Sequence, residues 1–230
     1  MKTLFLIPAR AGSKGIPHKN IKLFDGKPLI CYTIDTARQF VDDADICVST
    51  DGDDIIKVVE DYGLKVPFKR PDTLATDNAG SYGVMLHALD FYEKQGLHYD
   101  IMVLLQTTSP FRRVEDVKAC LDIFKQGDYD MVVSVCECKT NPYYNCFLAN
   151  EDGSLRHFVD KTDLQRRQDA PTCYEWNGAC YVMNVEELKN HSHIKMNHIG
   201  FSVMDELHSV DLDTMIDWKF AELIVKDKLI

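Results

Sequence analysis

Apolar runs of strand length alternate with longer amphipathic segments along most of the chain. The runs predict buried strands, since each ends at a turn or a change of polarity. The most apolar run, Ile101–Leu105, is expected at the centre of a sheet. The predicted strands are Thr3–Ala9, Asp45–Ser49, Lys65–Phe68, Ile101–Leu105, Met131–Val135, Ala179–Met183 and Ile199–Val203.

The amphipathic segments between these strands predict helices. One begins after Thr50-Asp51-Gly52-Asp53, which has the composition of a capping turn. The alternation of strand and helix favours an α/β fold, with a mostly parallel sheet covered by helices on both faces. Ligands of such sheets bind beyond the carboxyl ends of the strands. The predicted helices are Pro28–Phe40, Asp54–Tyr62, Asn78–Gln95, Val114–Lys125 and Asp213–Lys226.

The alternation stops between about Glu137 and Trp176. This segment contains Pro142, Gly153 and several charged residues. We interpret it as an inserted hairpin arm that makes a subunit contact. The length of 230 residues otherwise fits one α/β domain spanning residues 1–230, with the arm at about 137–176.

A glycine-rich turn that carries cations follows the first strand, in the segment IPARAGSKGIPHKN. Its cations are Arg10, Lys14 and Lys19. Backbone N–H groups exposed at the end of a strand, beside fixed positive charges, form a site for a polyphosphate. The turn therefore predicts that the protein binds a nucleotide.

Two common phosphate motifs do not fit this turn. The P-loop needs Lys and a hydroxyl residue directly after its second glycine, where Ile16 stands here. The dinucleotide fingerprint needs a G-x-G-x-x-G spacing, which Gly12 and Gly15 do not have. Pro17 also follows too soon for a smooth helix start.

The net charge of −10 argues against a nucleic-acid or anionic-membrane surface. A polyanionic substrate would therefore need a local positive island, built from basic residues near strand ends. The candidates for it are Arg10, Lys14, Lys19, Arg70, Arg112, Arg166 and Arg167.

Eight cysteines are scattered along the chain without a C-x-x-C pair. This usage indicates reduced thiols, a cytoplasmic location and no structural metal. No apolar stretch approaches transmembrane length, and the N-terminal apolar run is interrupted too early for a signal peptide.

Two carboxylates near the C-terminus are candidates for a metal site. Asp211 and Asp213 alternate with apolar residues, so in an extended chain both side chains would point the same way. A carboxylate pair beside a phosphate loop suits Mg²⁺. The alternative is that Asp213 caps the last helix.

Seven segments, in this order, resemble the acylneuraminate cytidylyltransferase (CMP-sialic acid synthetase) family: IPARAGSKGIPHKN, STDG, RPDTLATD, LLQTTSPFR, RRQDAP, NGACYV and SVDLDT. The resemblance implies a Rossmann-like α/β domain with a small dimerisation arm, and hence a homodimer. It also implies transfer of CMP from CTP to the anomeric 2-hydroxyl of a nine-carbon 2-keto sugar acid, with Mg²⁺ as cofactor and pyrophosphate as the second product.

The resemblance also implies roles for individual residues. Those that would hold CTP are Arg10, Ser13, Lys14, Lys19, Asn20, Arg70, Ala79 and Ser81. Those that would hold the sugar acid are Gln106, Arg167 and Tyr181. Asp211 and Asp213 would hold the metal, and one of them would help remove the proton of the sugar hydroxyl. The catalytic set would be Arg10, Lys14, Asp211 and Asp213.

The chain departs from the family pattern in the arm. Relatives acting on N-acetylneuraminate are expected to carry a Lys shortly after a Pro, whereas Tyr143 and Tyr144 follow Pro142 here. Kdo cytidylyltransferases carry an acidic residue in the turn after the central strand, where this chain has Thr108. A nine-carbon acid is therefore favoured over Kdo, with neuraminate, legionaminate, pseudaminate and KDN all open. A sugar-1-phosphate nucleotidyltransferase and a non-catalytic nucleotide sensor are the alternatives from other classes.

Overall fold

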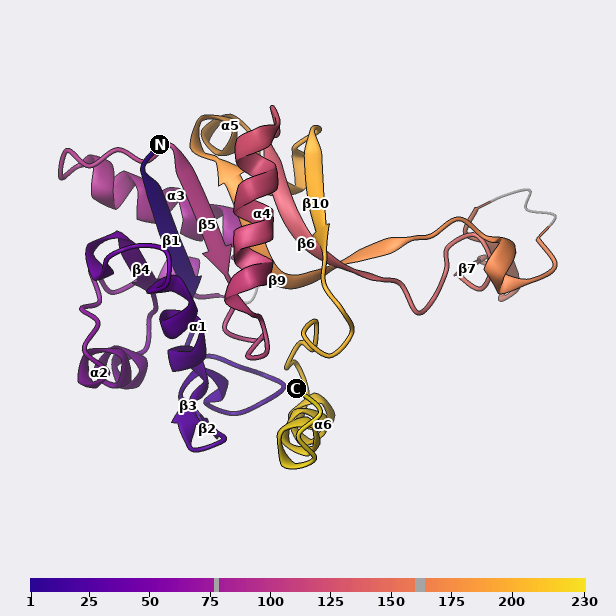
Figure 1. Ribbon diagram of the computed structural model, residues 1–230, viewed down its shortest axis with the longest axis horizontal. Helices are drawn as coiled ribbons and strands as arrows, with labels where there is room; N and C mark the ends of the chain where they lie inside the picture. Colours follow the sequence, from indigo (N-terminus) through magenta and orange to yellow (C-terminus); the bar gives the residue numbers. More distant parts are fainter. Residues whose placement is uncertain (77–78, 160–163) are drawn as a thin grey trace.

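A computed structural model of the protein describes residues 1–76, 79–159 and 164–230. A six-stranded sheet with the order β10-β6-β9-β5-β1-β4 forms its centre (Figure 1). Neighbouring strands pair in parallel except that β9 is antiparallel to both β5 and β6. The predicted α/β fold with a mostly parallel sheet is thus confirmed. The strands are β1 (Thr3–Pro8), β4 (Ile46–Ser49), β5 (Ile101–Leu105), β6 (Met131–Glu137), β9 (Tyr174–Asn184) and β10 (Ile199–Val203).

Helices cover both faces of the sheet, as predicted. Successive side chains of β1 alternate between the faces, so Phe5 and Ile7 pack with α1, α2 and α4, whereas Leu4 and Leu6 pack with α3 and α5. In the described part of the chain, no helix is long and apolar enough to cross a membrane. The helices are α1 (Leu29–Ala37), α2 (Asp53–Asp61), α3 (Ser81–Glu93), α4 (Val114–Gln126), α5 (Val185–Asn190) and α6 (Met215–Lys226).

A separate apolar cluster fixes the C-terminal helix beneath the glycine-rich turn. Trp218 of α6 stacks edge-on against Phe24, with their ring centroids 5.4 Å apart. Ile16 and Leu212 are fully buried in the same cluster. Phe24 belongs to a small hairpin of β2 (Leu23–Phe24) and β3 (Lys27–Pro28). The cluster therefore holds the C-terminal helix against the segment that follows the glycine-rich turn.

The structure corrects two expected elements. Lys65–Phe68 is not a strand, and only an isolated parallel bridge joins Thr50 to Lys69 there. Pro67, which has no N–H to donate, interrupts the expected strand. The last helix begins at Met215, because Thr214 is its N-cap and accepts a hydrogen bond from the Asp217 N–H. The alternative that Asp213 caps this helix is therefore wrong. Asn78, the expected start of the third helix, lies outside the described residues.

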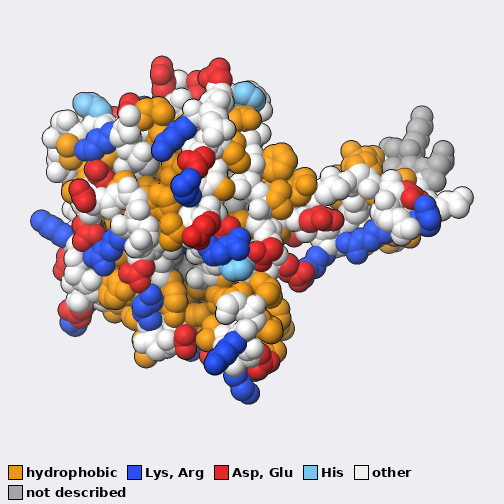
Figure 2. All heavy atoms as spheres, in the orientation of Figure 1, with side chains coloured by type: hydrophobic (Ala, Val, Ile, Leu, Met, Phe, Trp, Pro, Cys, Tyr) orange, Lys and Arg blue, Asp and Glu red, His pale blue; other side chains and the backbone are white. Residues whose placement is uncertain are grey.

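Between β6 and β9, the described residues 138–159 and 164–173 project from the body as an extended arm (Figure 1). Its base is antiparallel, with Glu137 opposite Tyr174. Apolar and basic side chains gather on the arm's surface (Figure 2). The arm carries a hairpin of β7 (Phe147–Ala149) and β8 (Leu155–His157). Short 3-10 helices lie at Lys19–Ile21, Asp43–Asp45, Asp72–Leu74, Arg167–Asp169 and His193–Lys195.

Candidate active site

A cavity of about 420 Å³ opens beyond the carboxyl ends of β1 and β5. It is lined by side chains from the glycine-rich turn, from the segment between α2 and α3, from the start of α3 and from the turn after β5. Asp213, from the far end of the chain, lines it as well. All eight residues predicted to hold CTP line this cavity, which we therefore call the nucleotide cavity: Arg10, Ser13, Lys14, Lys19, Asn20, Arg70, Ala79 and Ser81.

Asn20 joins the glycine-rich turn to the turn after β5. Its amide nitrogen donates to the Arg10 carbonyl at 2.9 Å, and its amide oxygen accepts from the Thr107 hydroxyl at 2.6 Å. Both ends of this buried amide are thus engaged within the protein. Asn20 therefore fixes the shape of the cavity wall, a role that the sequence did not indicate.

Lys19 ties the C-terminal carboxylate segment to the same wall. Its ammonium group donates to the Leu212 carbonyl at 2.7 Å and pairs with Asp213 at 3.1 Å. Gly15 approaches so closely that a Cβ there would lie 2.0 Å from the Asp213 carbonyl oxygen. The glycine at this position is therefore required for the segment to meet the turn.

Asp211 and Asp213 are neighbours that line different cavities. The Asp213 side chain is 71% exposed at the nucleotide cavity, whereas Asp211 is half-buried and lines two adjoining cavities. Asp211 Oδ1 is buried and has no hydrogen-bond partner within the described residues. Burial raises the pKa of Asp211, and Asp213 adds to this effect, whereas Thr108 and Lys19 oppose it.

The donor set fits Mg²⁺. Asp213 lines the cavity beside the glycine-rich turn, and Asp211, two residues before it, has a buried oxygen without a partner in the described residues. No cluster of three or more potential protein ligands occurs in the ranges that the structure describes. Mg²⁺ is commonly held by one or two carboxylates, with substrate phosphates and water completing the shell.

Arg70 forms the far wall of the nucleotide cavity. The residue is 4% exposed, and its Nε donates to the Ser49 hydroxyl at 3.0 Å. A second guanidinium nitrogen donates to the Ser49 carbonyl. Burial lowers the pKa of Arg70, but an arginine stays protonated at neutral pH. Ala79 and Ser81 lie on the same cavity.

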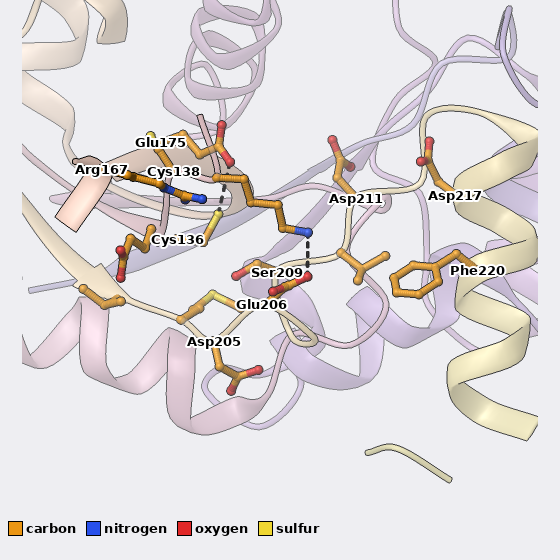
Figure 3. Close-up of a pocket in the computed structure, with 15 residues that line it drawn as sticks. Cys136, Cys138, Arg167, Glu175, Asp205, Glu206, Ser209, Asp211, Asp217 and Phe220 are labelled. Atoms are coloured by element: carbon orange, nitrogen blue, oxygen red, sulfur yellow. Dashed lines mark hydrogen bonds and ion pairs between the residues drawn. The ribbon is translucent and has the colours of Figure 1, made fainter. Parts of the chain in front are cut away.

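The three residues predicted to hold the sugar acid are distributed over the adjoining cavities. Gln106 and Tyr181 line one of about 360 Å³, together with Asp211. Arg167 lies on a larger one of about 670 Å³, which Asp211 also lines. Figure 3 shows Arg167 on one side of this cavity and Asp211 on the other. Gln106 also lines the nucleotide cavity, so it lies where that cavity meets the 360 Å³ cavity.

Two members of the predicted positive island have structural roles instead. Arg112 is buried and donates to the Gln106 carbonyl at 3.0 Å and the Ala179 carbonyl at 2.7 Å, so it braces β5 against β9 from beneath. Burial lowers its pKa to about 10. Arg166 pairs with Asp169 on the arm at 2.7 Å.

Known proteins resemble this chain in sequence and in fold. The chain matches the cytidylyltransferase family over residues 4–197. The CMP-N,N'-diacetyllegionaminic acid synthase of Legionella pneumophila is 33% identical over 98% of this chain and 97% of its own length. The N-acylneuraminate cytidylyltransferase of Streptococcus agalactiae is 35% identical over 95% of this chain and 52% of its own length.

A solved structure supports the fold. CMP:2-keto-3-deoxy-manno-octonic acid synthetase, in complex with CTP, superposes with a TM-score of 0.72 at 17% identity, and the match covers 99% of this chain and 100% of that one. At this identity the likeness shows the fold alone. The sequence matches confirm the resemblance predicted from the motifs. The chain is thus a nucleotidyltransferase that belongs to the cytidylyltransferase family.

Proposed function

We propose that the enzyme transfers CMP from CTP to the anomeric 2-hydroxyl of a nine-carbon 2-keto sugar acid of the sialic acid type, with release of pyrophosphate. The observation that carries this proposal is the nucleotide cavity, where eight side chains from distant parts of the sequence meet beside Asp213. The names of the relatives, which specify CMP transfer to acids of this class, support the choice of substrate.

In this proposal the triphosphate lies along the glycine-rich turn. Arg10 and Lys14 supply positive charge, and the backbone N–H groups and Ser13 hydroxyl supply hydrogen bonds. The cytosine ring lies against Arg70, Ala79 and Ser81. A cation, a backbone carbonyl and a hydroxyl can together read a ring edge that offers both donors and acceptors.

The sugar acid would occupy the cavities beyond Gln106, with Tyr181 beside it. Arg167 offers a planar guanidinium that suits two parallel hydrogen bonds to a carboxylate. Because Gln106 lines both sides of the junction, an acid held there would place its hydroxyl next to the phosphate chain of CTP.

The reaction is then an in-line displacement at the α-phosphorus by the 2-hydroxyl. The residues of the turn stabilise the charge that develops on the phosphoryl oxygens and the departing pyrophosphate. Asp211 is placed to accept the hydroxyl proton, because it lines both cavities assigned to the sugar acid and burial raises its pKa. Mg²⁺, held by Asp211 and Asp213, would neutralise phosphate charge when bound.

The identity of the acid is a finer question. Relatives at 33% and 35% identity are named for a legionaminic acid and for N-acylneuraminate, so overall similarity does not select one. Legionaminate, pseudaminate and KDN remain alternatives within the class. A Kdo substrate is less favoured because Thr108 replaces an acidic residue, and a sugar 1-phosphate is less favoured because the relatives are named for sugar acids.

Pyrophosphate release tests the proposal. We expect release with CTP, Mg²⁺ and at least one nine-carbon acid from a panel of neuraminate, legionaminate, pseudaminate and KDN. Removal of Mg²⁺ with a chelator should abolish it. Turnover with a sugar 1-phosphate, or with none of the acids, would contradict the assignment.

We further infer that the arm joins two copies of the chain. Phe147, Leu155 and Phe158 are 46%, 67% and 54% exposed on it, although such side chains are normally covered. Light scattering should therefore give twice the mass of one chain. Replacing Leu155 and Phe158 by lysine should give monomers, whereas Leu23→Lys, at an exposed apolar position on β2, should leave the dimer intact. A wild-type monomer at micromolar concentration would exclude this role.

A further inference from the structure

The end of β4 and the turn that follows it, residues 49–52, contact both halves of the nucleotide cavity. The Ser49 carbonyl accepts from the Ala9 N–H at 2.9 Å, and Asp51 Oδ1 accepts from the Ala11 N–H at 3.0 Å. Ala9 and Ala11, which carry these N–H groups, lie at the start of the glycine-rich turn. On the other side, the Thr50 carbonyl accepts from the Arg70 N–H at 2.7 Å. The turn thus sets the position of Arg70 relative to the phosphate side.

Ser49 also fixes the guanidinium of Arg70. A guanidinium is planar and donates in fixed directions. The Ser49 hydroxyl accepts from Nε at 3.0 Å, and the Ser49 carbonyl accepts from a terminal nitrogen. These two hydrogen bonds, both to Ser49, determine the plane of the guanidinium and the edge that it presents to the cavity. Both accepting atoms are neutral oxygens, and Ser49 is fully buried.

We propose that Ser49 is a positioning residue that sets the preference for CTP over UTP by orienting Arg70. This inference rests on the proposed function, in which Arg70 faces the pyrimidine ring. Cytosine presents an acceptor at N3, whereas uracil presents an N–H donor there and an acceptor at position 4. A guanidinium has only donors, so an orientation that suits N3 of cytosine opposes a donor to the N3–H of uracil.

The hydroxyl of Ser49 matters because it prevents the guanidinium from turning. Without it, Arg70 keeps its charge and its bond to the Ser49 carbonyl, but it can rotate toward the acceptor at position 4 of uracil. Affinity for CTP falls and that for UTP changes less, so selectivity is lost. A general loosening of the fold would instead weaken both nucleotides alike.

Calorimetric titration of the whole enzyme with CTP and with UTP tests this inference. In Ser49→Ala we expect the ratio of the two dissociation constants to fall about tenfold, the effect of one hydrogen bond to a charged group. The melting temperature is measured for each variant. Thr36→Ala is the matched control, since it also deletes a buried hydroxyl, one that donates to the Tyr32 carbonyl in α1. It should keep the wild-type ratio.

Arg70→Lys separates this inference from the proposed function. The lysine keeps the charge but lacks the planar fork, so it should also lose the preference for CTP. If Ser49→Ala or Arg70→Lys binds the two nucleotides with the wild-type ratio, the inference is overturned. Failure of the enzyme to release pyrophosphate would overturn the proposed reaction, while the binding ratio would still decide the role of Ser49.

Discussion

Replacing Lys14 by alanine is expected to lower turnover by about 10²–10³-fold, the usual cost of losing one preorganised donor to a developing negative charge. Lys14 lies on the glycine-rich turn and lines the nucleotide cavity. In the proposed reaction, negative charge increases on the phosphoryl oxygens as the bond to pyrophosphate breaks. A cation placed beside them therefore acts more strongly in the transition state than in the ground state.

The same substitution should leave the fold intact, because the Lys14 side chain is exposed and packs in no apolar cluster of the described residues. The kinetic measurement is initial pyrophosphate release at saturating CTP and acid, accompanied by thermal unfolding. Lys118→Ala is the control, since this lysine pairs with Asp122 on the outer side of α4. A Lys14→Ala enzyme that is correctly folded and turns over within a few-fold of wild type would remove Lys14 from the catalytic set.

Much of the architecture could be predicted from the sequence because it depends on local pattern. Ile101–Leu105 and Ile199–Val203 have the predicted bounds, and the helices on both faces follow from amphipathic periodicity. The antiparallel direction of β9 could not be predicted in this way. The direction of β9 depends on the course of the chain between β6 and β9, and the hydrophobic pattern of a single segment carries no information about that course.

The site shows the same division between local and long-range information. The glycine-rich turn can be recognised from its glycines and cations alone, and in the structure its three cations line one cavity. The sequence predicts Ser49 as the end of a strand and Asp51 as part of a capping turn, but it does not indicate their contacts, because the partners Arg70 and Ala11 are remote in sequence. The sequence predicts Arg112 as part of the positive island, yet its guanidinium is buried and donates to backbone carbonyls. A charge pattern cannot distinguish an arginine that faces a ligand from one that faces backbone carbonyls.

The second large effect is expected at Asp211. Asparagine has nearly the same shape but carries no charge and cannot accept the hydroxyl proton. We expect Asp211→Asn to lower turnover by about 10²–10⁴-fold, the range for loss of a positioned proton acceptor. The Mg²⁺ concentration for half-maximal activity should rise as well, because an amide oxygen is a weaker ligand than a carboxylate.

Stability distinguishes this effect from damage to the fold. Burial raises the pKa of Asp211, which means that the folded protein disfavours the charged form, so ionised Asp211 weakens folding at neutral pH. The neutral variant should therefore unfold in urea at the wild-type midpoint or above it. Asp213→Asn provides the comparison. Asp213 is 71% exposed and pairs with Lys19. In the proposed reaction it binds Mg²⁺ but does not accept the proton, so a smaller loss of turnover is expected. An Asp211→Asn enzyme with normal turnover and normal Mg²⁺ dependence would show that the proton leaves by another route, and that the buried carboxylate has a structural role instead.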